Sequence, residues 1–300
     1  MPAIRLTMDM FRSPEEVWEQ LLDPVLMVEW LGSEIRCDLR EGGMISFYGE
    51  EAPTTAEMGD TWTLKRIRPG HAVLMGWEIM GVDTLVYIRL TRIGPGTQLE
   101  LRHGSIPSSA RPLHLPEHWR LLMANFRSVL ELGEPAVRFN YREYRPVHVT
   151  RYDKPEVRAS VLCRTPPSLP FDVWTNPEKL RHFLKIERPV VDRRFGGIYT
   201  WWGEGMGPVV FTRIVQDREL EFTWAYRDEP ESRVNIRFEP VESSTLVSLH
   251  HYGFRDTQTA VGYNIGWSSV LAELKLTCEL GESGIRVDYM GDDMVMRNYP

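Results

Sequence analysis

Cysteine is scarce in this chain, which carries only Cys37, Cys163 and Cys278 among 300 residues. The three cysteines lie far apart and are odd in number, so they suggest neither a disulfide framework nor the paired spacing of a zinc site. Free thiols of this kind are typical of a reducing compartment. We therefore expect a cytoplasmic protein that needs no metal ion or other cofactor.

Long apolar runs and basic blocks are also missing. No segment approaches the roughly 20 apolar residues of a membrane-spanning helix, and the first ten residues carry Arg5 and Asp9 in place of the apolar core of a signal peptide. The formal net charge of −7 is spread along the chain, whereas a nucleic-acid partner requires a concentrated basic surface. These absences predict no membrane span and no nucleic-acid partner.

The chain instead contains an internal repeat with a period of about half its length. A chain of 300 residues suits two domains of roughly 100–150 residues each. Matching residues recur in the same order, and their offset varies only between 147 and 154 positions, which loop deletions explain. The pairs include Asp23-Pro24 with Asn176-Pro177, Gly42-Gly43 with Gly196-Gly197, Trp77 with Trp224, His103 with His251, and Trp119 with Trp267. This pattern indicates a tandem domain duplication.

Each half shows the same succession of periodic patterns. An alternating apolar strand is followed by two short helices, about five further strands and a long amphipathic helix. A curved antiparallel sheet wrapped on that last helix buries all of the apolar stripes at once. We predict an α+β fold of two tandem helix-grip domains at residues 1–134 and 153–283, joined by a linker at 135–152 and followed by a C-terminal tail at 284–300.

Short motifs in both halves carry a family resemblance. The second half contains Trp174-Thr175-Asn176-Pro177, Phe195-Gly196-Gly197, Phe222-Thr223-Trp224 and Gly266-Trp267, and the first contains Leu21-Leu22-Asp23-Pro24, Gly42-Gly43 and Gly76-Trp77. The first half departs from the pattern at His118, which stands where the second half has Gly266. In this order the motifs resemble the START/Bet v-like (SRPBCC) superfamily, and within it the branch of homologues of the activator of heat-shock-protein ATPase. The resemblance covers nearly the whole chain.

The resemblance implies a fold and a range of functions. Members of this superfamily are similar in holding a cavity between the sheet and the long helix, often for a hydrophobic small molecule. Some are polyketide cyclases or lyases, some are lipid carriers and some bind a chaperone. For this chain the resemblance implies a small hydrophobic molecule as partner. It implies a chaperone partner more weakly, because nothing in the sequence resembles the separate N-terminal domain of the eukaryotic activators.

Four residues are candidates for ligand contacts in such a cavity. If the strands alternate, Trp77 and His103 in the first half and Trp224 and His251 in the second face the long helix. An aromatic wall with one polar group is a common composition for a small-molecule site. The alternative is that both tryptophans fill the core and both histidines are buried side chains with satisfied hydrogen bonds. The sequence leaves both interpretations open.

One further motif concerns metal binding. His114-Leu115-Pro116-Glu117-His118 has the spacing of a zinc-binding His-x-x-Glu-His helix. Pro116 is favoured at the first helical position, which leaves His114 in the preceding loop and off the helix face that a zinc site needs. The second half has no equivalent motif. We expect no metal here.

Three functions remain open from the sequence. The favoured one is a binding protein for a small hydrophobic or amphipathic molecule, with a cavity in one or both domains. The alternatives are a protein-interaction module of chaperone-activator or stress-response type, and a cyclase- or hydrolase-like enzyme that uses His103 or His251 as a general acid or base. No catalytic residue is assigned, and a binding role is favoured over an enzymatic one.

Overall fold

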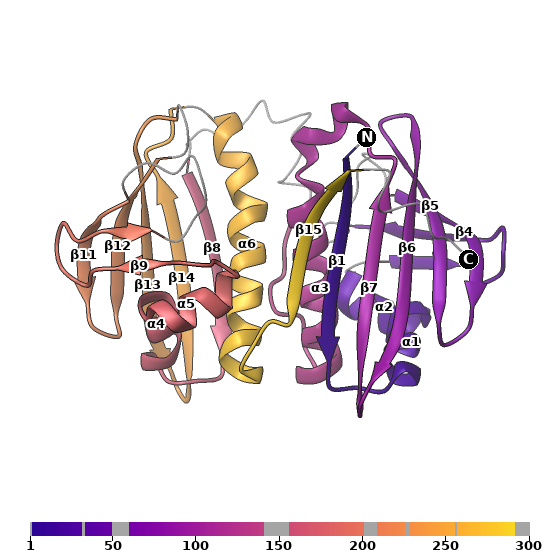
Figure 1. The fold of residues 1–300 in the computed structure, drawn as a ribbon, viewed down its shortest axis with the longest axis horizontal. Helices are drawn as coiled ribbons and strands as arrows, with labels where there is room; N and C mark the ends of the chain where they lie inside the picture. Colours follow the sequence, from indigo (N-terminus) through magenta and orange to yellow (C-terminus); the bar gives the residue numbers. More distant parts are fainter. Residues whose placement is uncertain are drawn as a thin grey trace. The chain divides into compact units, whose positions relative to one another are not determined.

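The chain folds as two compact units of the same kind. The computed structural model describes residues 2–31, 34–49, 60–140, 156–200, 209–225, 229–255 and 257–291. Unit 1 consists of residues 1–144 together with 284–300, and unit 2 of residues 145–283. Each unit combines an antiparallel sheet with helices, as Figure 1 shows. The predicted α+β class and the tandem helix-grip architecture are confirmed.

Unit 1 is built on one antiparallel sheet in the order β15-β1-β7-β6-β5-β4-β3-β2. The long helix α3 packs against α1, α2, β1 and β15. The elements are β1 (Pro2–Met10), α1 (Pro14–Leu22), α2 (Pro24–Leu31), β2 (Glu34–Cys37), β3 (Met44–Tyr48), β4 (Asp60–Arg68), β5 (Ala72–Ile79), β6 (Val82–Ile93), β7 (Gly96–Gly104), a 3₁₀ turn η1 (Ser108–Leu113), α3 (Leu115–Leu132) and β15 (Ile285–Gly291).

Unit 2 repeats this succession around a sheet in the order β11-β12-β13-β14-β8. Its long helix α6 packs against β8, α4 and α5, and a two-stranded ribbon, β9-β10, is linked to the strands by the bridge between Ile198 and Val210. The elements are β8 (Glu156–Cys163), α4 (Ser168–Thr175), α5 (Pro177–Leu184), β9 (Val190–Val191), β10 (Tyr199–Thr200), β11 (Phe211–Val215), β12 (Glu219–Trp224), β13 (Ser232–Val241), β14 (Ser244–Tyr252) and α6 (Thr257–Leu280).

The repeated Asp-Pro and Asn-Pro dipeptides begin the second short helix of each unit. The Asp23 carboxylate accepts hydrogen bonds from the backbone amides of Val25 and Leu26, at 2.8 and 3.3 Å. The Asn176 side chain accepts in the same way from the first turn of α5. In both cases the proline takes the first helical position, where no backbone N–H is needed.

The repeated Gly-Gly pairs bring two neighbouring strands together. Gly42 and Gly196 have φ of 82° and 73°, a conformation that other residues rarely adopt. A Cβ on Gly43 would collide with the Asp38 carbonyl oxygen, and one on Gly197 with that of Asp192. Both pairs therefore require glycine because of local backbone geometry, which explains their recurrence without a functional role.

The segment predicted as a C-terminal tail contains a strand. Residues 285–291 form β15, which pairs antiparallel with β1 from Pro2↔Gly291 to Met8↔Ile285. Ile285 is 2% exposed and so belongs to the core of unit 1. Residues 285–291 alternate between apolar and polar residues over too short a length to indicate a partner strand. Their partner, β1, lies at the opposite end of the chain. Over the described residues, no helix is long and apolar enough to cross a membrane.

Removal of β15 tests this assignment. A chain that stops at Ser283 leaves the backbone groups on one side of β1 without a partner and loses the buried side chain of Ile285. Because full burial of an isoleucine contributes about 1.5–3 kcal/mol, we expect the free energy of unfolding of unit 1 to fall by at least about 2 kcal/mol in urea titrations. A chain that stops at Gly291 keeps β15 and is the control. Equal midpoints for the two truncated chains would contradict the pairing.

Candidate functional site

The predicted residues Trp77 and His103 meet in the interior of unit 1. Trp77 lies on β5 and His103 on β7, and their rings stack at 5.5 Å between centroids with an interplanar angle of 18°. The His103 Nε2 atom lies 2.8 Å from the hydroxyl of Thr84 on β6. The indole N–H of Trp119 on α3 donates to His103 Nδ1 at 3.0 Å. His103 therefore ties the long helix to the sheet.

The hydrogen bonds define the protonation state of this histidine. An indole N–H can only donate, so His103 Nδ1 must accept and the ring must carry its proton on Nε2. That proton is donated to Thr84, whose own hydroxyl donates to the Trp77 carbonyl oxygen at 2.6 Å. The result is a directional chain from indole through imidazole and hydroxyl to the backbone, with both ring nitrogens used.

Unit 2 contains the same chain of hydrogen bonds. Trp267 on α6 donates to His251 Nδ1 at 3.0 Å, and His251 Nε2 lies 2.8 Å from the Ser232 hydroxyl. The Ser232 hydroxyl donates to the Trp224 carbonyl oxygen at 3.2 Å. Trp224 and His251 are adjacent, as in unit 1, but their rings meet at 67°. The structure thus brings together the predicted pair in each unit.

Sequence reasoning missed two members of each chain. The repeat pairs Trp119 with Trp267 without indicating that they are partners of the histidines, and it does not single out Thr84 or Ser232. The available signal was positional, because Thr84 precedes His103 by the same 19 residues that separate Ser232 from His251. Thr84 and Ser232 could therefore have been identified as a hydroxyl residue that recurs at the same position in both halves.

Burial controls the charge of both histidines. His103 and His251 are each 0% exposed. Burial lowers the pKa of His103 to about 3, and burial together with the nearby His250 lowers the pKa of His251 to about 3. Both rings are therefore neutral at pH 7, in agreement with the hydrogen-bond pattern. Contact of these four residues with a ligand stays a prediction.

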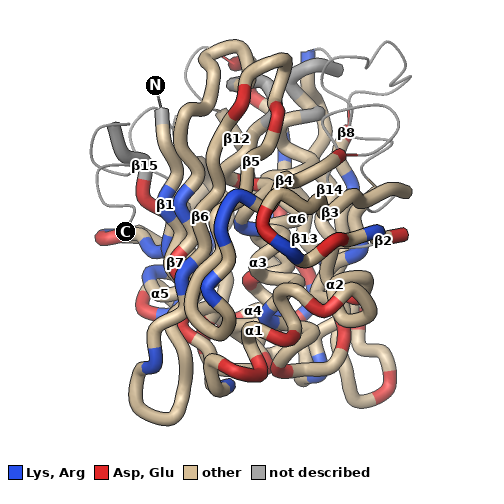
Figure 2. The backbone as a smooth tube through the Cα atoms, turned by 90° about the vertical axis from the view of Figure 1, so that its right-hand side faces the viewer, with Lys and Arg blue, Asp and Glu red and all other residues tan. Residues whose placement is uncertain are grey.

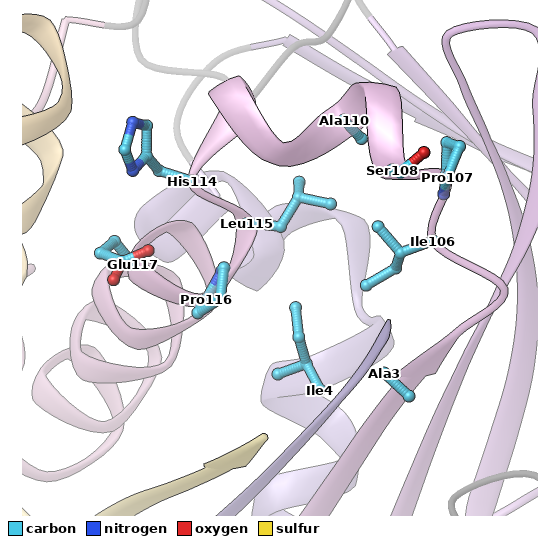
Figure 3. Close-up of a pocket in the computed structure, with 10 residues that line it drawn as sticks. All are labelled: Ala3, Ile4, Ile106, Pro107, Ser108, Ala110, His114, Leu115, Pro116 and Glu117. Atoms are coloured by element: carbon cyan, nitrogen blue, oxygen red, sulfur yellow. The ribbon is translucent and has the colours of Figure 1, made fainter. Parts of the chain in front are cut away.

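A cavity of about 490 Å³ lies elsewhere in unit 1, beside the first turn of α3. Figure 3 shows Ile4, Ile106 and Leu115 pointing toward one another in it, with Pro107 and Ser108 on one side and His114 and Glu117 on the other. Its lining residues are Ala3, Ile4, Ile106, Pro107, Ser108, Ala110, His114, Leu115, Pro116 and Glu117. Trp77 and His103 are not among them.

Aromatic rings explain why the cavity lies at this end of the helix. Trp62, Trp77 and Trp119 form a cluster with centroid separations of 5.9–6.1 Å, and each is at most 3% exposed. This cluster fills the interior between the sheet and α3. The cavity lies beside the first turn of α3, where the lining side chains are smaller.

The His-x-x-Glu-His motif forms part of the cavity wall. The helix begins at Leu115 with Pro116 in its first turn. His114 precedes the helix, as predicted from the position of Pro116, and has φ of 48°. Burial lowers the pKa of His114, opposed by Glu117, and burial and His114 lower the pKa of His118 to about 3. No group of three or more side chains suited to a metal ion occurs in the described part of the chain.

The outer face of the unit 1 sheet carries charges of both signs. Glu100, 3% exposed, accepts hydrogen bonds from Arg5, Arg89 and Arg102 at 2.7, 2.7 and 2.9 Å. Figure 2 shows acidic and basic positions side by side on these strands. The arginines are thus engaged with a carboxylate, and this face does not form the concentrated basic surface that nucleic acid requires.

Comparison with known proteins adds a family. A family model described as Activator of Hsp90 ATPase homolog 1-like protein matches residues 12–131 and again residues 164–279. The chain is similar to DynU16, a protein in the dynemicin biosynthetic locus, with 20% identity over 93% of this chain and 99% of that one and a TM-score of 0.37. A comparison with curated proteins gave no match.

Two further structures match a single copy. CalU16 from Micromonospora echinospora is 25% identical over 43% of this chain and 74% of its own, with a TM-score of 0.36. An Hsp90 activator from Plasmodium falciparum is 20% identical over 42% of this chain and 96% of its own, with a TM-score of 0.38.

The buried histidines predict a pH dependence of stability. Unfolded imidazoles take up a proton near pH 6.5, but folded His103 and His251 do so only near pH 3. The contribution of these two neutral rings to the free energy of unfolding is therefore complete above pH 6.5, and it is lost as the pH falls toward 3. At pH 5 we expect each to lower the free energy of unfolding by about 2 kcal/mol relative to pH 7, measured in urea titrations at each pH.

Variants isolate this contribution. His103→Gln with His251→Gln cannot take up these protons, so the double variant should lose less stability than the wild type between pH 7 and pH 5. The exposed His71 provides the control, because His71→Gln leaves both buried histidines in place. The same pH slope in the double variant and the wild type would show that the two imidazoles do not titrate on unfolding.

Proposed function

The chain belongs to the family of Activator of Hsp90 ATPase homolog 1-like proteins, in two copies, and on this premise we propose that unit 1 binds a small hydrophobic or amphipathic molecule. The observation that carries the proposal is the cavity beside the first turn of α3. Its volume of about 490 Å³ lies within the range of roughly 300–1,000 Å³ that is usual for small-molecule sites.

The lining supports an amphipathic ligand. Ile4, Ile106 and Leu115 are nearly fully buried and offer the apolar surface. Ser108, His114 and Glu117 supply the few polar groups that orient a ligand in such sites. An apolar body would therefore lie against the aliphatic side chains, and a polar group would reach the hydroxyl, imidazole or carboxylate.

The geometry does not support an enzyme that uses His103 or His251 as its acid or base. A general acid or base needs a ring nitrogen that can reach the substrate and a pKa near the working pH. His103 and His251 have both nitrogens in internal hydrogen bonds, and their pKa values are about 3. Their proposed role is to hold each long helix on its sheet, and we do not propose catalysis through them.

A second candidate function is protein interaction of the activator type. Three apolar side chains in or beside the β9-β10 ribbon are exposed: Val190 by 50%, Phe195 by 82% and Ile198 by 52%. Exposed apolar groups gathered on one element are typical of protein-interaction sites. The name of the family model supports an Hsp90 as the partner to test first.

Binding in the cavity can be tested by placing a bulky side chain at an exposed lining position. Ser108 and Ser109 are adjacent and exposed, but only Ser108 lines the cavity. We expect the full chain to bind the neutral fluorescent probe N-phenyl-1-naphthylamine, with an increase in emission and in Tm. Ser108→Trp should lower the affinity at least about 10-fold, which corresponds to about 1.4 kcal/mol. Ser109→Trp is the matched control. Equal titrations for the two variants would place the probe outside this cavity.

The second candidate predicts an effect on a chaperone. If the ribbon contacts Hsp90, addition of the chain to a purified Hsp90 should raise its ATPase rate, and Phe195→Ser should reduce that effect. Phe11, in unit 1 and 66% exposed, provides a matched control as Phe11→Ser. An ATPase rate that is unchanged over a range of chain concentrations would remove this candidate.

A further inference from the structure

The duplication supplies an internal reference for the cavity. Ile4 on β1 pairs with His103, and Val157 on β8 pairs with His251, so the first strands are in equivalent register. Ile106 follows His103 by three positions, as Phe254 follows His251. Leu115 precedes Trp119 by four positions, as Tyr263 precedes Trp267. Phe254 and Tyr263 are therefore the unit 2 counterparts of two cavity-lining residues.

In unit 2 these positions hold a stacked aromatic pair. Phe254 and Tyr263 stack at 5.3 Å with an interplanar angle of 28°. Their centroids lie 4.2 and 4.9 Å from that of His251, so the pair packs directly on the buried imidazole. Two flat rings thus occupy the region that corresponds to the unit 1 cavity.

The tyrosine hydroxyl also satisfies a buried donor in unit 2. The Trp224 indole N–H donates to the Tyr263 oxygen at 3.0 Å, and the Tyr263 hydroxyl donates to Glu229 at 2.7 Å. This oxygen therefore accepts from one side and donates to the other.

Unit 1 lacks both the rings and the acceptor. Ile106 and Leu115 are smaller, and they line the cavity. The Trp77 indole N–H, the counterpart of the Trp224 donor, is buried and has no hydrogen-bond partner among the described residues. The Trp77 ring lies flat on His103, whereas Trp224 stands at an angle to His251. A buried donor without a partner is unfavourable. Among the described residues, unit 1 thus has an unfilled space where unit 2 has Phe254 and Tyr263, and an unsatisfied donor whose unit 2 counterpart donates to Tyr263.

We infer that the occupant of the unit 1 cavity is a planar aromatic molecule with a hydroxyl group, which replaces the Phe254–Tyr263 pair of unit 2. The ring system lies between Ile106 and Leu115, and its oxygen accepts from Trp77 as the Tyr263 oxygen accepts from Trp224. This inference rests on the proposed function and adds the chemical class of the ligand.

Three compounds of one shape separate the contributions of the ring and the hydroxyl. We propose calorimetric titration of the full chain with 2-naphthol, with naphthalene, which lacks the hydroxyl, and with 2-decalol, which keeps the hydroxyl on a saturated skeleton. Aromatic contacts and a hydrogen bond to a buried donor each correspond to roughly a 2- to 10-fold gain in affinity. We expect 2-naphthol to bind more tightly than each of the other compounds by about that factor.

Exchange of the two residue pairs between the units tests the location. Ile106→Phe with Leu115→Tyr copies the aromatic pair into unit 1 and should abolish 2-naphthol binding and raise Tm. Phe254→Ile with Tyr263→Leu should add a binding site for 2-naphthol in unit 2. If this second variant does not fold, as judged by circular dichroism, the unit 1 variant decides the question alone.

The outcomes distinguish the inference from the proposed function. If 2-decalol or naphthalene binds as tightly as 2-naphthol, and binding is lost in the filled variant, the aromatic hydroxyl class is wrong but the cavity still binds an apolar ligand. If none of the three compounds binds, or if the filled variant binds 2-naphthol as well as the wild type does, the proposed function falls together with the inference.

Discussion

A neutral histidine between a helix and a sheet is the interaction on which each unit depends. Among the described residues, no backbone hydrogen bond joins the long helix to the sheet, so its placement rests on side chains. In unit 1 the Trp119 indole, the His103 ring and the Thr84 hydroxyl form a chain that has only one permitted direction. A directional chain with every member satisfied specifies one placement of the helix, which apolar packing alone does less well. The ring must stay neutral, and burial ensures that it does.

A second contact fixes the other end of each helix. In unit 1, Arg127 and Glu131 form an ion pair at 2.9 Å with both side chains almost fully buried, and Glu131 also accepts from the backbone N–H of Phe11. In unit 2, Lys275 and Glu279 pair at 2.8 Å, and Glu279 accepts from an amide at the end of β8. The carboxylate meets the first strand at the same point in both units. Since a buried charge is costly without a partner, the pairing restricts how far the helix can slide or rotate.

Local chemistry could be predicted from the sequence, whereas distant pairing and empty space could not. Pro116 indicated a helix that begins after His114, and α3 begins at Leu115. Strand alternation placed His103 and His251 inside. The pairing of β15 with β1 joins opposite ends of the chain, and no local pattern encodes it. The location of the cavity was not predicted, because it depends on residue size at Ile106 and Leu115. A comparison of each half with the other at these positions would have shown aliphatic residues opposite aromatic ones.

The shared frame explains how one unit can be open while its copy is filled. Phe254 and Tyr263 pack on the imidazole in unit 2, but neither belongs to the hydrogen-bond chain that anchors the helix. Aliphatic residues at the matching positions therefore create volume without breaking that chain. This substitution has one consequence: within the described part of the chain, the Trp77 indole N–H has no acceptor in place of the Tyr263 oxygen. An unpaired buried donor is unfavourable by about 1–3 kcal/mol, and a ligand that supplies an acceptor recovers part of this free energy. Affinity for a ligand and lower stability of the empty unit then have the same physical origin.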